Sequence, residues 1–342
     1  MRKQIYFLLC IFFSNVVFAQ TSELSVNSSI GQNTAANKTL VSKNLKISVN
    51  KDSGSFIFYA KESINKAENE KKTNDWVKIL SEKAIPSSYF IFLKDGISVG
   101  YGTDNKGIHT CQIKWNEIKY AWENTDVRII STFSFLQNIS TSSYDGFNIN
   151  LNIRNISESD IELATIACFD GNNDSLEEHY FTSNRRISNE QELIGSDIKD
   201  FVIINTLIEH TALKLFIPEM RLPDSSENIK PKRIYFTNWR RMRDHNSGNF
   251  TVNTGRLFNT EPYSDNDSAL FIEYPSRKIS PNEYIEINFK LNIENSKISA
   301  GSQAKLDELF MLLNEINQKL NDNEVVEKKY LNELDDRIDT LK

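Results

Sequence analysis

The chain has 342 residues, of which 39 % are hydrophobic and 25 % are charged, a composition typical of folded globular proteins. With 12 Gly and 7 Pro it is neither collagen-like nor a Pro-rich disordered chain. The net charge of −6 leaves no excess of Lys and Arg to displace counterions from phosphates, so nucleic acid is not an expected partner.

The first nineteen residues have the features of a signal peptide. Arg2 and Lys3 form a basic start, residues 5–18 are almost entirely apolar, and Ala19 offers the small side chain that signal peptidase reads. The apolar run is shorter than the roughly 20 residues of a membrane-spanning helix. We therefore expect cleavage near Ala19 and a periplasmic or secreted mature chain with no membrane span. Lipid modification of Cys10 is the alternative.

Cleavage would leave two cysteines, each inside a strand-like run. In an oxidising compartment Cys111 and Cys168 either form a disulfide or remain two separate buried thiols, and the sequence leaves both alternatives open.

The residues after the signal change from a polar leader to a strand pattern. Residues 20–44 are rich in Ser, Asn and Thr and are expected to be a flexible leader. From residue 45 apolar residues alternate with polar ones, and a turn at Gly54 leads into an aromatic strand over residues 56–59, which predicts a hairpin. The charged residues 62–82 are interpreted as a short helix or an ordered loop.

Strand-like runs separated by turn-forming Asp-Gly and Ser-Gly pairs then follow at regular spacing. These runs cover residues 89–93, 108–115, 127–136, 147–153, 161–169, 201–208, 212–217, 233–236, 268–274 and 283–293. Many strands without intervening helices predict a mainly β protein, with broad antiparallel sheets packed as one large sandwich over residues 45–295.

The pattern changes again near the end of the chain. After a small polar linker at residues 296–302, apolar residues in residues 303–342 repeat at steps of three and four, which predicts a helical, coiled-coil-like tail. The residues of this seam, expected to serve assembly, are Leu306, Leu309, Leu313, Ile316 and Leu320. The seam is interrupted at residues 321–323, so a helical hairpin or a helix docked on the sandwich remains the alternative.

One loop has oxygen-bearing side chains at alternate positions. Asp170, Asn172 and Asp174 resemble the start of a calcium-binding loop, because calcium requires several oxygen ligands at close range. The rest of the loop does not follow the EF-hand pattern, and an Asx-rich turn between strands is the alternative. No other cofactor is expected.

A second loop gathers cations beside an aromatic ring. Trp239, Arg240, Arg241 and Arg243 could receive an acidic sugar or an acidic partner by stacking and bidentate hydrogen bonds. If the segment continues as a strand, Trp239 packs inward and the arginines pair with acidic groups of the chain, which is the alternative.

Catalytic motifs are not recognisable among the four His or around the Ser residues, so we assign no catalytic residue. Paired carboxylates for glycoside hydrolysis would have to come from six acidic residues. These are Asp170, Asp174, Glu190, Glu192, Asp265 and Asp267.

The order of these segments resembles secreted bacterial proteins with a galactose-mutarotase-like β-supersandwich. The resemblance lies in residues 44–59, 170–174, 233–239 and 266–283, and it spans about residues 44–293. It implies the fold and sugar binding, with stacking on Trp115, Trp122 or Trp239. The catalytic members use a His acid and a Glu base, and His179 and His210, the His residues of the middle strands, match no such motif.

We therefore predict a non-catalytic interaction or scaffold protein of the bacterial cell envelope, with a partner bound by the sandwich and assembly or docking by the tail. The expected partners are envelope proteins or glycans. A carbohydrate-binding or sugar-modifying protein is the alternative.

Overall fold

The structure is a computed structural model. It describes residues 37–61, 75–80, 86–103, 106–137, 143–171, 180–182, 185–206, 208, 211–222, 228–245, 250–263 and 267–295. The expected signal peptide, linker and tail lie outside the described residues.

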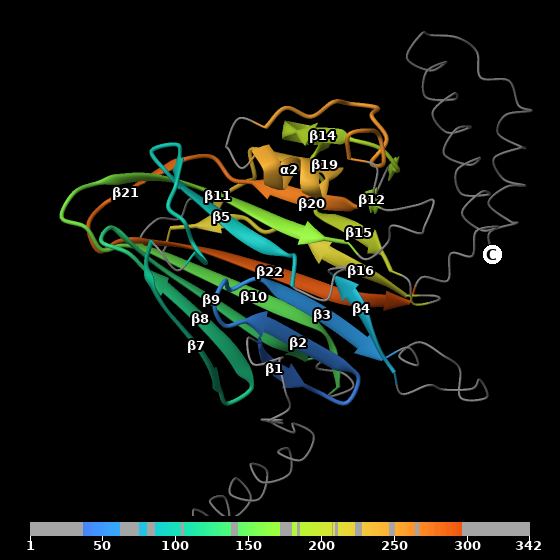
Figure 1. Ribbon diagram of the computed structural model, residues 1–342, viewed down its shortest axis with the longest axis horizontal. Helices are drawn as coiled ribbons and strands as arrows, with labels where there is room; N and C mark the ends of the chain where they lie inside the picture. Colours follow the sequence, from blue (N-terminus) through green and yellow to red (C-terminus); the bar gives the residue numbers. More distant parts are fainter. Residues whose placement is uncertain are drawn as a thin grey trace, which may run out of the picture.

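The described chain forms three antiparallel sheets and one short α-helix, which confirms the predicted mainly β sandwich (Figure 1). The 4-stranded sheet has the order β1 (Asn37–Val41), β2 (Leu45–Asn50), β3 (Phe56–Lys61) and β4 (Trp76–Leu80).

The largest sheet has eleven strands. Its order is β13 (Arg185–Ile187), β12 (Tyr180–Thr182), β15 (Phe201–Asn205), β16 (Thr211–Phe216), β22 (Tyr284–Asn295), β10 (Tyr144–Asn155), β9 (Val127–Gln137), β8 (Glu117–Glu123) and β7 (Ile108–Lys114), while β17 (Met220–Arg221) pairs with β22 and with β18 (Asn228–Ile229).

The 7-stranded sheet lies above the 11-stranded sheet in Figure 1. Its order is β14 (Gln191–Ile194), β19 (Arg233–Asn238), β20 (Ser268–Glu273), β11 (Ile161–Asp170), β5 (Tyr89–Lys94) and β6 (Ile97–Ser98), with β21 (Arg277–Ile279) paired to β11. A 3-10 turn, η1 (Gly195–Asp197), follows β14, and α2 (Trp239–His245) follows β19.

Alternation of apolar and polar residues places one face of each long strand in the core. Along β10, Phe147, Ile149 and Leu151 are fully buried, while the residues between them are partly exposed. The same inner face of the 11-stranded sheet receives both smaller sheets. Phe58 of β3 stacks on Phe147 at 4.2 Å between ring centroids, and Phe90 of β5 stacks on Phe289 of β22 at 6.0 Å.

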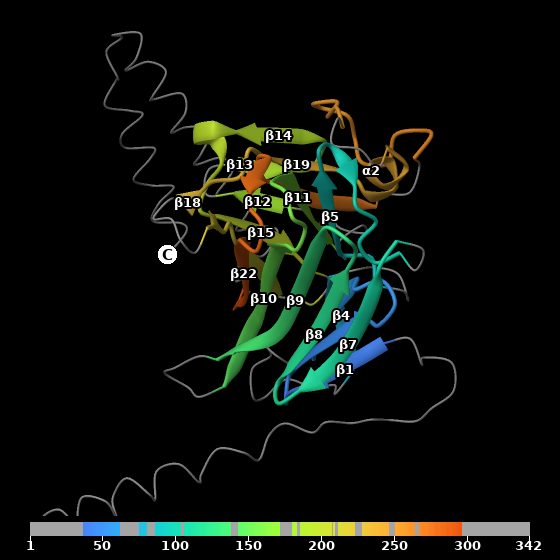
Figure 2. The same cartoon turned by 90° about the vertical axis from the view of Figure 1, so that its left-hand side faces the viewer.

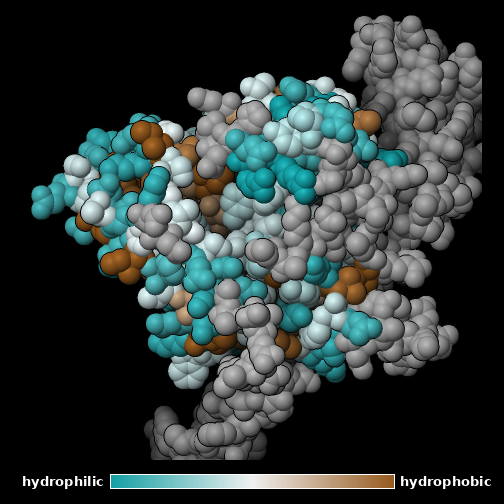
Figure 3. Space-filling model, in the orientation of Figure 1, coloured by the Kyte–Doolittle hydropathy of each residue, from teal (hydrophilic) through white to brown (hydrophobic). Residues whose placement is uncertain are grey.

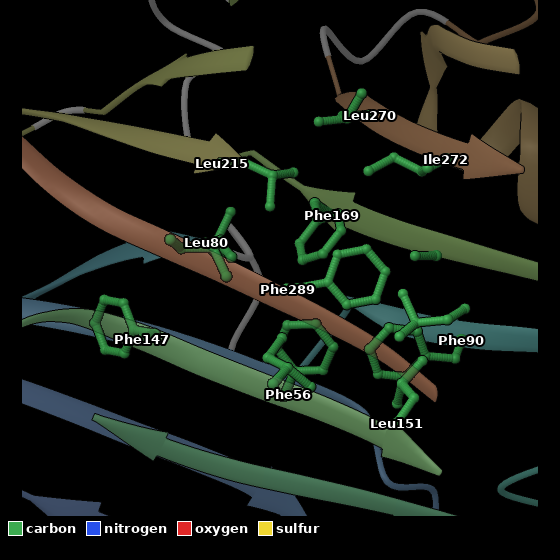
Figure 4. Packing of buried hydrophobic residues seen from close by; sticks show 14 of the residues in the cluster. Phe56, Leu80, Phe90, Phe147, Leu151, Phe169, Leu215, Leu270, Ile272 and Phe289 are labelled. Atoms are coloured by element: carbon green, nitrogen blue, oxygen red, sulfur yellow. The ribbon is translucent and has the colours of Figure 1, made fainter. Parts of the chain in front are cut away.

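Phe56 lies where the three sheets meet (Figure 4). Its ring centroid is 5.4 Å from that of Phe90, 5.3 Å from that of Phe133 and 6.1 Å from that of Phe169. These partners belong to β5, β9 and β11, so one side chain on β3 joins all three sheets through ring contacts. Because such packing removes a large apolar surface from water, it fixes the 4-stranded sheet against the other two.

Three local expectations differ from the structure. The strand β1 lies within the expected leader and pairs with β2 along its whole length, because Leu40 is buried in the core although residues 37–39 before it are polar. Residues 76–80 form β4, a strand where a helix or loop was expected, since β3 offers them a free edge. The strand β8 was not predicted, although its buried Ile118, Tyr120 and Trp122 alternate with exposed or partly exposed residues.

Candidate functional site

The cation-rich segment is helical, so its interpretation as a continuing strand is wrong. Asn238 ends β19 and caps α2, since its Oδ1 accepts a hydrogen bond from the backbone N–H of Arg241 at 3.1 Å. Trp239 and Met242, three residues apart, then share the buried face of the helix. This face covers the outer side of the 7-stranded sheet, where Tyr235 and Phe271 form a second apolar cluster.

Trp239 is a packing residue at this helix. Its side chain lies against Tyr89 with ring centroids 6.2 Å apart, and its Nε1 donates to the backbone oxygen of Ser87 at 2.9 Å. The Arg243 guanidinium stacks on the outer side of the indole at 4.9 Å and pairs with Asp244 at 3.0 Å. Arg240 is exposed on the same helix.

Arg241 is separated from these groups because it points into a buried network around Glu190. The Glu190 carboxylate is fully buried and accepts hydrogen bonds from Arg241 Nη1 at 2.7 Å and Arg256 Nη1 at 2.9 Å. The Thr237 hydroxyl donates to it at 2.9 Å, and the Asn253 backbone N–H donates at 3.2 Å. All four donors converge on one carboxylate, so this group ties α2 and the following loop to β19.

Glu192, also one of the six acidic residues considered for hydrolysis, is engaged together with Glu273. Arg233 bridges Glu192 of β14, at 2.8 Å, and Glu273 of β20, at 2.5 Å. Lys232 adds a contact to Glu273 at 2.9 Å. Arg241 and Arg233, with the carboxylates that they bind, therefore hold three strands and a helix together.

The predicted calcium loop is only partly within the described residues. Asp170 ends β11 and is fully buried; the Ser87 hydroxyl donates to its carboxylate, and its backbone N–H donates to Ser88 Oγ at 3.0 Å. Asn172 and Asp174 lie outside the described residues. In the parts of the chain that the structure describes, no group of three or more His, Cys, Asp or Glu side chains could hold a metal ion.

The two cysteines are free thiols on different sheets, Cys111 on β7 and Cys168 on β11. Burial raises the pKa of Cys111 to about 11. Burial also raises the pKa of Cys168, helped by the nearby carboxylates Asp170 and Asp267. Both thiols are therefore protonated and weakly nucleophilic at neutral pH.

Of the three Trp residues considered for stacking, two are buried and one is exposed. Trp122 is 0 % and Trp239 8 % exposed, whereas Trp115 is 84 % exposed at the tip of the hairpin formed by β7 and β8. It belongs to a two-residue turn, because Lys114 pairs with Glu117. Its backbone φ of +58° is strained for a bulky residue, and the first position of such a turn usually carries Gly.

An open hollow of about 580 Å³ lies at the other end of β7. It is lined by Val99, Lys106, Gly107, Ile108, Glu123, Asn124 and Thr125. Ile108 is 80 % exposed, and Gly107 fits only because it has no Cβ, which would lie 2.5 Å from the Trp122 ring. The face of the molecule in Figure 3 is mostly hydrophilic, and its apolar residues form small separate patches. The exposed side chain of Ile108 contrasts with this surface.

The sequence did not show that β7 has an exposed Trp at one end and an open hollow at the other. Residues 108–115 were expected to be one strand, and Trp115 is instead its turn residue. The signal was present in the alternation of residues 117–123, which predicts the returning strand.

Several predicted residues lie outside the described residues. They are His179, His210, Asp265 and the tail residues Leu306, Leu309, Leu313, Ile316 and Leu320. In the described residues no helix is long and apolar enough to cross a membrane.

Comparison with known proteins gives a likeness of fold. No family model and no curated protein matches the chain. It is similar to a galactose mutarotase-like protein from Clostridium acetobutylicum, with 12 % identity and a TM-score of 0.42 over 80 % of this chain and 100 % of that one. A galactose mutarotase related enzyme from Lactobacillus acidophilus gives 8 % identity and a TM-score of 0.42, covering 76 % and 98 % of the two chains.

A 4-alpha-glucanotransferase from Thermococcus litoralis gives 9 % identity and a TM-score of 0.40, over 78 % of this chain. The chain spans 38 % of the length of that enzyme. These are distant likenesses of fold, and they assign the chain no activity.

Proposed function

We propose that this chain is a non-catalytic interaction protein of the bacterial cell envelope, exported to the periplasm or secreted, whose sandwich binds a partner through the β7–β8 hairpin. The observation that carries the proposal is Trp115, a bulky aromatic residue held at φ +58° and 84 % exposed. A strained backbone that presents an apolar ring to solvent lowers the stability of the free protein, and such strain is concentrated at functional sites. Contact with a partner would bury the ring and offset this loss.

The edge of the sheet supports the same surface. The strand β7 is the last of the 11-stranded sheet and forms a regular seven-residue pairing with β8. Long regular edges are usually shortened, charged or covered because their backbone groups can pair with another chain. The carboxylates Glu190 and Glu273, in contrast, are bound by arginines of the protein itself, which supports a structural role for them.

Site-specific photo-cross-linking tests the proposal. A photoreactive aromatic residue replaces Trp115, and the same residue replaces Leu257, which is 57 % exposed elsewhere on the chain, as the matched control. We expect an adduct at position 115 that is absent at 257 and is competed away by excess unlabelled wild-type protein but not by Trp115→Gly. Equal adducts at both positions, or none at 115, would overturn the proposal.

Carbohydrate binding is the second candidate, and the outer face of the 11-stranded sheet favours it. Amide and hydroxyl side chains follow one another across the strands, with Thr132 opposite Asn150 and Asn150 opposite Asn288. The Oδ1 atom of the neighbouring Asn148 is buried without a hydrogen-bond partner. The amide and hydroxyl groups of this face can donate to and accept from the hydroxyl groups of a sugar.

Calorimetric titration of a panel of neutral oligosaccharides tests this second candidate. Asn148→Ala with Asn150→Ala should abolish binding, whereas Gln137→Ala at the exposed end of β9 should leave it unchanged. An absence of heat from every oligosaccharide, or equal affinity in both variants, would refute it.

A further inference from the structure

The strand β7 is an open edge of the protein. Figure 2 shows β22, β10, β9, β8 and β7 in this order, with β7 outermost. Among the strands of the described residues, only β8 pairs with it, through all seven residues and without a register shift. The opposite edge of the same sheet is the three-residue strand β13, which offers far less backbone to a partner.

The hairpin register decides which backbone groups face outward. The two-residue turn makes Lys114 and Glu117 the closing pair, which in such turns is hydrogen-bonded. Hydrogen-bonded and non-hydrogen-bonded pairs alternate along an antiparallel ladder, so the N–H and C=O of Cys111 and Ile113 are directed away from β8. Cys111 is the middle residue of β7, with three strand residues on either side.

Trp115 and the hollow lie at opposite ends of this edge. Trp115 is four residues after Cys111, and Gly107, in the wall of the hollow, is four residues before it. A two-fold rotation about Cys111 therefore brings the exposed ring of one chain opposite the hollow of a second, identical chain. A single symmetry operation thus relates the two features that the isolated chain leaves unexplained.

We propose that two copies of this chain pair their β7 strands antiparallel, in a register centred on Cys111, with each Trp115 seated in the partner copy's hollow. This inference rests on the proposed function, because it names the occupant of the same hairpin surface. Cys111 of each copy exchanges backbone hydrogen bonds with Cys111 of the other, and the two 11-stranded sheets become continuous. Each buried Trp removes about 150–250 Å² from water.

The side chains that this register brings together are compatible. On the outer face Lys114 meets Ile108, and Gln112 meets Thr110, so no two like charges oppose each other. On the inner face the Cys111 side chain, next to Tyr120 of β8, meets its own copy, and Ile113 meets His109. A shift by one residue would exchange the two faces of the strand, and a shift by two would move Trp115 away from Gly107, so the seating of Trp115 selects this register.

Disulfide trapping tests the register directly in full-length protein. In a Cys111→Ala background, Thr110→Cys and Gln112→Cys are made as separate variants, which lie on the solvent face of β7. The proposed register places Thr110 of one copy directly opposite Gln112 of the other, at the short spacing of a non-hydrogen-bonded pair. Mild oxidation of the mixed variants should give a covalent dimer, and each variant alone should give at least tenfold less.

Sedimentation velocity provides the second measurement. Trp115→Gly keeps the turn, because Gly adopts the required positive φ, and should raise the dimer dissociation constant at least tenfold. The matched control is Ile194→Ala, which removes an apolar side chain that is 58 % exposed on β14. It should leave the dissociation constant unchanged.

The two proposals fail in different ways. No covalent dimer from the mixed variants, or equal yields from mixed and single variants, overturns the β7 dimer. If position 115 then still cross-links a different protein, the proposed interaction function stands without the dimer. If it cross-links nothing, both fail.

Discussion

Replacing Glu190 with Gln should strongly destabilise the protein while changing the shape of the side chain very little. The carboxylate accepts four hydrogen bonds, two at each oxygen, from Arg241, Arg256, Thr237 and the Asn253 backbone. A glutamine has one acceptor oxygen, so in either orientation its NH₂ group faces an arginine N–H, which cannot accept a hydrogen bond. The loss of at least one bond, and of the charge that neutralises two guanidinium groups, should lower the free energy of unfolding by about 3–5 kcal/mol.

Urea unfolding followed by Trp fluorescence and circular dichroism measures this change through the midpoint and slope of the transition. Asp197→Asn is the control, since it breaks the ion pair between Asp197 and Arg185, whose side chains are 54 % and 36 % exposed, and should cost at most about 1 kcal/mol. Combining Glu190→Gln with Arg241→Met should cost less than the sum of the two single changes. The reason is that Arg241→Met removes the guanidinium charge that Glu190→Gln leaves without a carboxylate partner. A loss below about 1 kcal/mol for Glu190→Gln would refute the reasoning and show that water solvates this network.

Phe56→Ala should lower the free energy of unfolding by about 3–5 kcal/mol in the same assay, since it removes a ring that contacts all three sheets. Gly102→Ala should destabilise the protein more than Gly96→Ala. Both positions have positive φ, but of the two only Gly102 has backbone close by, since an added Cβ would lie 2.2 Å from the Ser53 backbone oxygen. Thermal melts of the two variants measure the difference. At alkaline pH stability should fall above pH 9, because unfolded thiols ionise near their ordinary pKa of 9.0 while burial raises the pKa of folded Cys111 to about 11. Urea titrations at pH 8 to 11, compared with Cys111→Ala, measure that loss.

Three outcomes would contradict these expectations. A Phe56→Ala loss similar to that of Phe216→Ala, whose ring is 37 % exposed, would show that the three sheets are not coupled through Phe56. Equal melting temperatures for the two glycine variants would show that the loop moves away from Ser53. A pH profile unchanged by Cys111→Ala would show that water reaches that thiol in the folded protein.

The strand pattern of this fold could be predicted from the sequence wherever burial on one face of the sheet produces a period of two. Residues 147–153 are an example, because each apolar residue faces the core and each polar residue faces outward. Short strands such as β1 and β4 carry too few alternating residues, and a neighbouring edge decides their conformation.

The candidate site was less predictable. Trp239 and the following arginines suit a strand or a helix, and the Asn238 cap together with the apolar cluster beneath selects the helix. Arg241 and Glu190 are 51 residues apart in the chain, so their ion pair depends on the packing of β14 beside β19.

The sequence by itself determined that the chain is a mainly β protein of broad antiparallel sheets, because the burial of alternate side chains is a local property of each strand. Only the tertiary structure decided that Trp115 is an exposed turn residue, that a hollow lies at the other end of β7, and that both flank an open sheet edge. The reason is physical: exposure, edges and hollows depend on which segments pack beside a strand, and distant parts of the chain supply those segments.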